Sequence, residues 1–103
     1  MHFVYILYNE STDKFYVGET EDMDRRMHEH ADAVFKRSYT SYSRGWQLKK
    51  VIQVENRIEG RRVESFIKRK KSSVFIQRII VDANYYNKIK ARIFEELGVK
   101  IQD

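Results

Sequence analysis

The chain has 103 residues, 42% of them hydrophobic, with a formal net charge of +5 at pH 7 and an isoelectric point near 9.5. A chain of this length forms one domain with a modest core, so we expect a single domain over residues 1–103. The absence of cysteine excludes disulfides, thiol catalysis and Cys-ligated metal sites. No apolar run approaches the roughly 18 residues of a membrane span, and the start lacks a basic leader, so we expect a cytoplasmic protein without membrane contact.

The first part of the chain predicts a β-hairpin. Residues 2–8 are rich in β-branched and aromatic side chains, which is typical of a buried strand. The turn-forming residues 9–14 follow, and residues 15–18 then supply the partner strand.

A helix is predicted over residues 21–33. Met23 and Met27 have helical spacing, and acidic residues occupy the first turn. We expect Thr20 or Glu21 near the helix cap.

Residues 36–45, which are rich in Ser, Tyr and Arg, predict a loop, and residues 46–54 predict a third strand. Residues 57–71 have apolar side chains at helical offsets and predict a second helix, although Gly60 costs this helix about 1 kcal/mol. The basic side chains of this region and of the loop are candidate contacts to a nucleic-acid backbone.

Two further helices are predicted over residues 74–81 and 84–97, the last ended by Gly98. Residues 74–80 are apolar enough that a strand is the alternative. The order β-β-α-β-α-α, with one more helix after it, predicts an α+β fold in which helices flank a small three-stranded antiparallel sheet.

Positive charge is concentrated late in the chain. Residues 57–71 contain seven basic and two acidic side chains, a pattern that suits a polyanion because neutralised phosphates release counterions. A solvated helix face is the alternative. The candidate nucleic-acid contacts are Lys36, Arg37, Arg44, Arg61, Arg62, Lys68, Arg69, Lys70 and Lys71.

Two pairs of side chains lie four residues apart on the predicted helices. Arg26 and His30 project from one helix face and are positioned to grip one phosphate, unless they are ordinary surface residues. Glu64 and Lys68 have the same spacing, and their alternative is an intrahelical ion pair worth about 0.2–0.5 kcal/mol.

The hairpin carries a motif that connects these pairs. Phe3-Val4-Tyr5 and Tyr16-Val17-Gly18 place two tyrosines on adjacent strands, and Arg26 and His30 follow Gly18 by eight and twelve residues. Thr40, Trp46-Gln47-Leu48 and Glu64-Ser65-Phe66-Ile67-Lys68 come later. Together these residues resemble the GIY-YIG nuclease family, in particular its small stand-alone members.

The resemblance covers about residues 2–75 and leaves residues 76–103 as a helical C-terminal extension of a GIY-YIG-like fold. Phe3 stands where the family has its first glycine, and Val17 stands where it has isoleucine. The resemblance implies a metal-dependent endonuclease that hydrolyses phosphodiester bonds in DNA, in repair or recombination. The implied catalytic residues are Tyr5, Tyr16, Arg26, His30 and Glu64.

Each implied residue has a role in phosphodiester hydrolysis. Glu64 would hold Mg²⁺ or Mn²⁺, and Arg26 would bind phosphate oxygens through its planar fork. Tyr5 would orient or deprotonate the attacking water, with Tyr16 beside it. Because a tyrosine with a pKa near 10 is a poor base at neutral pH, we expect nearby cations to lower the pKa of Tyr5, or another group such as His30 to share the task.

Two other classes of protein stay open. One is a non-catalytic nucleic-acid-binding module or subunit with the nuclease fold, and the other is a protein-interaction domain with a basic face. A homodimer, or a partner protein that targets this chain to its substrate, is compatible with both the nuclease and the binding module. If the nuclease interpretation holds, the hydroxyls of Tyr5 and Tyr16 should converge on Arg26 and Glu64.

Overall fold

The computed structural model describes the backbone of residues 1–35 and 45–103, and the side chains of residues 1–29 and 45–103. Its sheet has three antiparallel strands in the order β2-β1-β3. The central strand β1 (His2–Asn9) pairs on one side with β2 (Lys14–Thr20) and on the other with β3 (Trp46–Val54). This is the antiparallel sheet that the sequence predicts.

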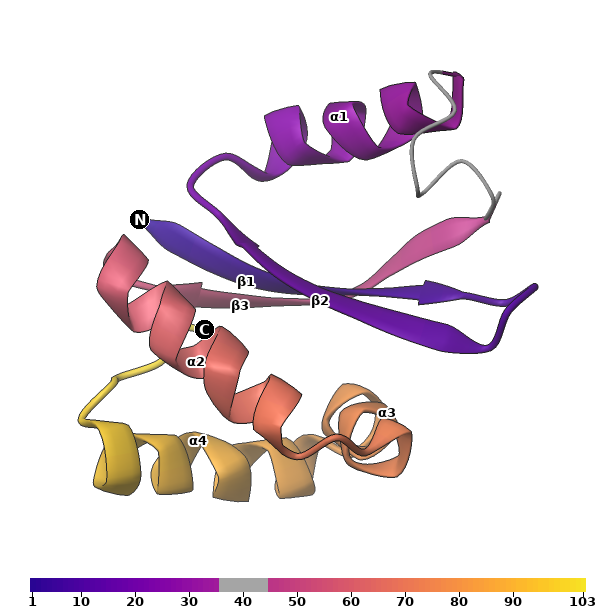
Figure 1. Cartoon of the computed structure of the whole chain (residues 1–103). Coiled ribbons are helices and arrows are strands. Elements are labelled where there is room, and N and C mark those ends of the chain that lie inside the picture. The colour runs from indigo at the N-terminus through magenta and orange to yellow at the C-terminus, as the bar shows by residue number, and fades with distance from the viewer. Residues whose placement is uncertain (36–44) are drawn as a thin grey trace.

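The helices form two layers. Helix α1 (Met23–Phe35) lies on one side of the sheet, and α2 (Arg57–Arg69), α3 (Ser73–Val81) and α4 (Ala83–Leu97) lie on the other (Figure 1). The fold is therefore α+β, as expected. Among the described residues, no helix is both long enough and apolar enough to cross a membrane.

The hydrophobic core lies between the sheet and α2, α3 and α4. Alternate residues of β1 point to opposite faces of the sheet, so Val4 and Ile6 enter this core whereas Tyr5 faces α1. The same cluster contains Ile79 of α3 and Ile93 of α4. The C-terminal helices thus share one core with the hairpin.

Helix α1 begins two residues later than predicted because Asp22, rather than Thr20 or Glu21, caps it. The Asp22 carboxylate accepts a hydrogen bond from the backbone N–H of Arg25 at 3.0 Å. Thr20 instead bonds through its hydroxyl to the backbone of Asp22, at 3.1 Å to the N–H and 3.2 Å to the carbonyl.

The next two helices are short and separately capped. Helix α2 ends at Arg69 rather than residue 71, and Lys71 adopts a left-handed conformation with φ of 46°. Ser72 caps α3 by accepting a hydrogen bond from the N–H of Phe75, so the alternative of a strand over residues 74–80 is wrong.

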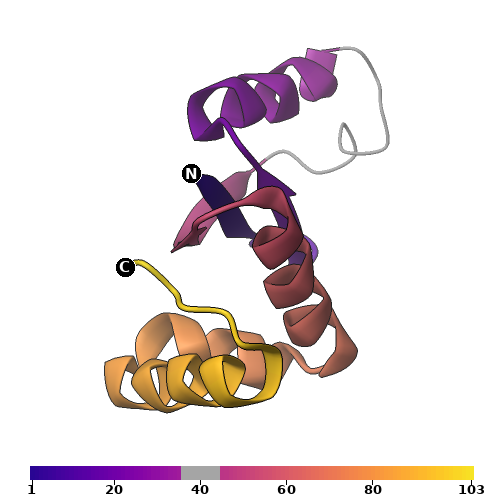
Figure 2. The same ribbon diagram turned by 90° about the vertical axis from the view of Figure 1, so that its left-hand side faces the viewer.

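Helix α4 ends where the sequence predicts. Gly98 has a left-handed φ of 69°, a conformation that glycine adopts without steric cost. Beyond it the chain is not helical and returns toward the sheet (Figure 2). The backbone N–H of Gln102 donates to the carbonyl of Gln53 in β3 at 2.7 Å, and Tyr86 donates to the Asp103 carboxylate at 2.7 Å.

Gly60 has a packing reason for its place inside α2. A Cβ atom there would lie 2.6 Å from Cδ2 of His2, whose buried ring is hydrogen-bonded to Glu19. We predict that Gly60→Ala destabilises the fold by about 1–3 kcal/mol through overpacking, although alanine is favoured by about 1 kcal/mol in an unobstructed helix. Urea unfolding measures the change.

The control for Gly60→Ala is the same substitution in a His2→Ala background. Removing the ring opens the space, so the added methyl should then stabilise α2. Equal effects in the two backgrounds would show that the His2 contact is not the cause.

Candidate active site

Tyr5 connects the sheet to α1. Its ring is fully buried in the central strand, and its hydroxyl accepts a hydrogen bond from Nε of Arg26 at 2.7 Å. Arg26 lies in the first turn of α1, next to the Asp22 cap. The helix cap and the strand therefore position these two side chains against each other.

Gly18 provides the space that the Tyr5 ring occupies. It is the cross-strand partner of Tyr5 in β2, and a Cβ atom at this position would lie 2.4 Å from the Tyr5 hydroxyl oxygen and 2.5 Å from Cζ. Any side chain here would displace the phenol ring. The glycine of the motif is thus required by the tyrosine opposite it.

Tyr16 completes an aromatic group beside the guanidinium. Its ring centroid lies 6.1 Å from that of Tyr5 and 6.3 Å from that of Trp46, which it meets edge-on. Its hydroxyl accepts a longer hydrogen bond, 3.5 Å, from Nη2 of Arg26. One guanidinium therefore contacts both tyrosines of the motif.

Arg26 is further held by Glu29, one helical turn away, whose carboxylate lies 2.8 Å from Nη1. The hydrogen bond to Tyr5 is the largest cause that raises the pKa of Arg26 above its ordinary value, so the guanidinium is a cation at every physiological pH. About a third of the side chain, 34%, stays exposed. Sequence reasoning missed Glu29, although its spacing of three residues from Arg26 is a recognisable signal.

The pKa of Tyr5 is raised to about 12, which is opposite to the expected direction. Burial is the largest cause and contact with Tyr16 adds to it, whereas Arg26 lowers the pKa by less than burial raises it. Among the protein's own groups, desolvation thus outweighs the nearby cation. Tyr5 is a neutral phenol at physiological pH and has a proton to donate.

Glu64 lies on α2, on the other side of the sheet from α1, and its ion-pair partner is Lys68 of the same helix at 3.4 Å (Figure 1). The intrahelical ion pair considered from spacing therefore exists. The expected convergence of Glu64 with Tyr5 and Arg26 stays a prediction. The Glu64 side chain is 21% exposed. Within the described part of the chain, no three acidic or histidine side chains form a group that would hold a metal ion. A single accessible carboxylate nevertheless fits a hard cation such as Mg²⁺, which keeps several waters and takes one or two carboxylates.

The remaining predicted site residues come after Glu29 in the chain. His30 lies on this helix, four residues after Arg26, but its side chain is outside the described residues. The predicted nucleic-acid contacts of the loop, Lys36, Arg37 and Arg44, are also outside the described residues.

Three of the four arginines of α2, namely Arg61, Arg62 and Arg69, share a shallow hollow of about 420 Å³ next to Leu97. Arg62 donates to the backbone carbonyl of Leu97 at 3.4 Å, at the C-terminal end of α4. Arg61 lies 3.9 Å from Glu19. Arg69 lines the same hollow.

The lysines at the end of α2 lie elsewhere. Lys68 and Lys71 line a groove against β2, and Lys70 lies over the ring of Phe66 at 4.7 Å. The basic side chains of residues 57–71 therefore do not share one surface.

The raised pKa of Tyr5 predicts a loss of stability at alkaline pH. Between pH 10 and about 12 the unfolded chain releases the Tyr5 proton while the folded protein keeps it, so stability that is present below pH 10 falls by on the order of 2 kcal/mol as pH rises. Burial raises the pKa of Tyr86 in the same direction. Phenolate absorbance, together with urea unfolding at pH 9 and pH 11, measures both effects.

Tyr5→Phe is the matched control for this titration. It removes the buried phenol, so one late-ionising tyrosine should disappear and the alkaline loss of stability should become smaller. Normal ionisation of every tyrosine near pH 10 in the folded protein would contradict the prediction.

A family model described as the GIY-YIG catalytic domain matches residues 1–78. No curated protein and no solved structure matches the chain. The matched span contains the hairpin with both tyrosines, Arg26, and the helix that carries Glu64. Nucleases of this family generally depend on divalent metals, and the match supports a nuclease-type function that acts on nucleic acid. The chain belongs to the GIY-YIG family.

Proposed function

We propose that this protein is an endonuclease that uses Mg²⁺ or Mn²⁺ to hydrolyse phosphodiester bonds in DNA, in the cytoplasm, during repair or recombination. The observation that best supports the proposal is the contact of Arg26 with both motif tyrosines, at 2.7 Å to Tyr5 and 3.5 Å to Tyr16. Hydrolysis requires groups that are already placed around the phosphate before charge develops on it. A fixed guanidinium and two phenols meet this requirement.

Arg26 binds the phosphate in this mechanism. Its charge is permanent, and its planar fork matches phosphate oxygens better than lysine would. Glu29 occupies Nη1 in the structure, so an incoming phosphate would replace or share that partner. The contacts with the tyrosines meanwhile keep the guanidinium plane in place.

Tyr5 acts as a hydrogen-bond donor rather than as a base. With a pKa of about 12 it holds its proton at neutral pH, while its oxygen accepts from Arg26. The hydroxyl hydrogen then orients the attacking water or a phosphate oxygen. Tyr16, which is partly exposed on the edge strand, contacts the same phosphate. In this proposal His30 takes up the proton from the water.

Glu64 would hold the divalent cation. When bound, the cation would neutralise charge on the phosphate and lower the pKa of a coordinated water. Lys68 must share or release the carboxylate for this to occur, because it lies 3.4 Å from it.

The same ion pair is the observation that favours a non-catalytic nucleic-acid-binding module. If Lys68 permanently occupies Glu64, the family fold would bind nucleic acid without cleaving it. Association with a second copy or a partner protein would then supply targeting. Metal-dependent cleavage decides between the two functions.

We predict that Glu64→Gln lowers cleavage by orders of magnitude while DNA binding persists or tightens. The substitution keeps side-chain volume but removes the charge that a hard cation requires and that repels phosphate. Arg26→Ala should also abolish cleavage, but it should weaken binding because a phosphate contact is lost.

The measurement is cleavage of labelled linear, nicked, branched and single-stranded substrates with Mg²⁺, Mn²⁺ or EDTA, together with equilibrium binding. Lys88→Ala, which removes one charge from an exposed position on α4, is the control and should leave both unchanged. Full cleavage activity in Glu64→Gln would contradict the proposal that Glu64 holds the required metal ion. No wild-type activity on any substrate would establish the binding module instead.

A further inference from the structure

A groove of about 420 Å³ leads away from Tyr16 along the edge strand β2. Lys14, Phe15 and Val17 of β2 form one wall, and the connection from α2 to α3 forms the other. Because Tyr16 lines this groove and also contacts Arg26, the groove adjoins the proposed reaction centre. We name it the lysine groove, after Lys14, Lys68 and Lys71.

The charge of the lysine groove is positive on both walls. Lys14 is on the strand side, and Lys68 and Lys71 are on the helix side. Asp13 is the one acidic residue among the described lining residues, and its carboxylate accepts a hydrogen bond from Tyr8 at 2.6 Å. The walls therefore suit a chain of phosphates that passes between them.

The hollow on the other side of Arg26 has a different character. It measures about 560 Å³, and four glutamates lie among its lining residues beside three arginines and His2. Its mixed charge attracts a polyanion less than the lysine groove does. A strand that leaves the reaction centre is thus favoured to pass along β2.

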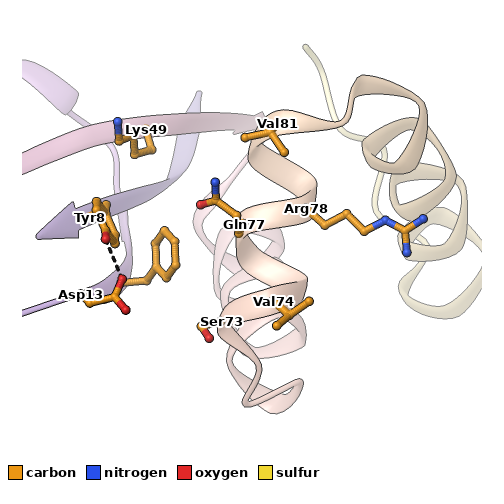
Figure 3. Close-up of a pocket in the computed structure, with 9 residues that line it drawn as sticks. Tyr8, Asp13, Lys49, Ser73, Val74, Gln77, Arg78 and Val81 are labelled. Carbon is orange, nitrogen blue, oxygen red and sulfur yellow. Dashed lines mark hydrogen bonds between the residues drawn. The ribbon is translucent and has the colours of Figure 1, made fainter. Parts of the chain in front are cut away.

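An aromatic surface lies further along the same path. The rings of Tyr8 and Phe15 are 4.9 Å apart, and Phe15 lines both the lysine groove and a second hollow of about 660 Å³. In that hollow, Gln77 of α3 lies across the gap from Tyr8 and Ser73 lies one turn earlier on the same helix, whereas Arg78 points away (Figure 3). Lys49 of β3 lines the same hollow, on the side of Tyr8 (Figure 3).

We propose that the lysine groove binds a single-stranded segment of the substrate on one side of the cleaved phosphate. Phosphates of that segment lie against Lys14, Lys68 and Lys71, and an unpaired base stacks on Phe15. This inference rests on the proposed nuclease function. Basic walls combined with an aromatic platform are how proteins bind single strands, whereas the bases of an intact duplex are already stacked and cannot reach the ring.

Lys71 provides a sharp test because replacing it with glycine should weaken DNA binding without lowering the stability of the fold. Its φ of 46° lies in the left-handed region, where a lysine is strained and a glycine is not. Lys71→Gly should therefore keep or raise the melting temperature while it removes a phosphate contact. Phe15→Leu keeps an apolar side chain against the core but removes the stacking surface.

The experiment measures DNA binding in EDTA, so that no cleavage occurs. Two probes are compared, a blunt duplex and the same duplex with a single-stranded extension of several thymidines. For the wild-type protein, we expect the extension to raise affinity about tenfold, as one stacked base does. It should also steepen the dependence of log affinity on log salt by roughly 0.7 for each additional phosphate contacted.

The variants test whether the affinity added by the single-stranded extension arises in the lysine groove. Lys71→Gly should reduce the added salt slope by roughly 0.7, and Phe15→Leu should remove most of the added affinity, each measured relative to the same variant's binding of the blunt duplex. Lys88→Ala removes the same charge far from the groove and should change neither. Melting temperatures of all variants verify that each protein is folded.

Two outcomes would overturn the inference without affecting the proposed function, which is tested separately by metal-dependent cleavage. In one, the extension adds no affinity to the wild-type protein. In the other, it adds affinity that Lys71→Gly and Phe15→Leu both retain, so that the strand binds elsewhere. Failure of the wild-type protein to bind either probe would overturn the inference together with the proposed substrate.

Discussion

The partly buried hydrogen bond from Arg26 to Tyr5 is the contact on which the rest of the site depends. It joins the central strand to α1 at 2.7 Å and fixes the guanidinium over the sheet. The hydrogen bond can form because Gly18 leaves space for the phenol ring. It also requires the helix to begin after the Asp22 cap, which puts Arg26 in the first turn of α1. A side chain at residue 18 or a shifted helix start would separate the pair.

The same burial determines the chemistry of Tyr5. Two effects compete at its hydroxyl, since loss of water disfavours the phenolate and the positive charge of Arg26 favours it. Burial prevails and raises the pKa to about 12. The tyrosine therefore keeps its proton at neutral pH, and in the proposed mechanism a more basic group removes the proton from the attacking water. Proximity to an arginine does not by itself activate a tyrosine.

The C-terminal helices stabilise the helix that carries Glu64. Ile89 and Ile93 of α4 lie in the same hydrophobic cluster as Val63 and Ile67 of α2. Arg62 also bonds the end of α4, where helix carbonyls lack partners within the helix. Residues beyond the family match at 78 thus contribute to the core that positions α2 beside β2.

The sequence by itself determined the hairpin, the last helix with its Gly98 terminus and the motif spacing, because each depends on neighbours within a few residues. The choice between helix and strand for residues 74–80 was left to the structure. Only the tertiary structure decided the protonation of Tyr5, which depends on burial from all sides. It also distributed the basic side chains of residues 57–71 over separate surfaces and brought Lys71 and Lys14 to one groove. The spacing of charged residues along a helix can be read from the sequence. The surface that each charged side chain faces depends on strands that are distant in the chain.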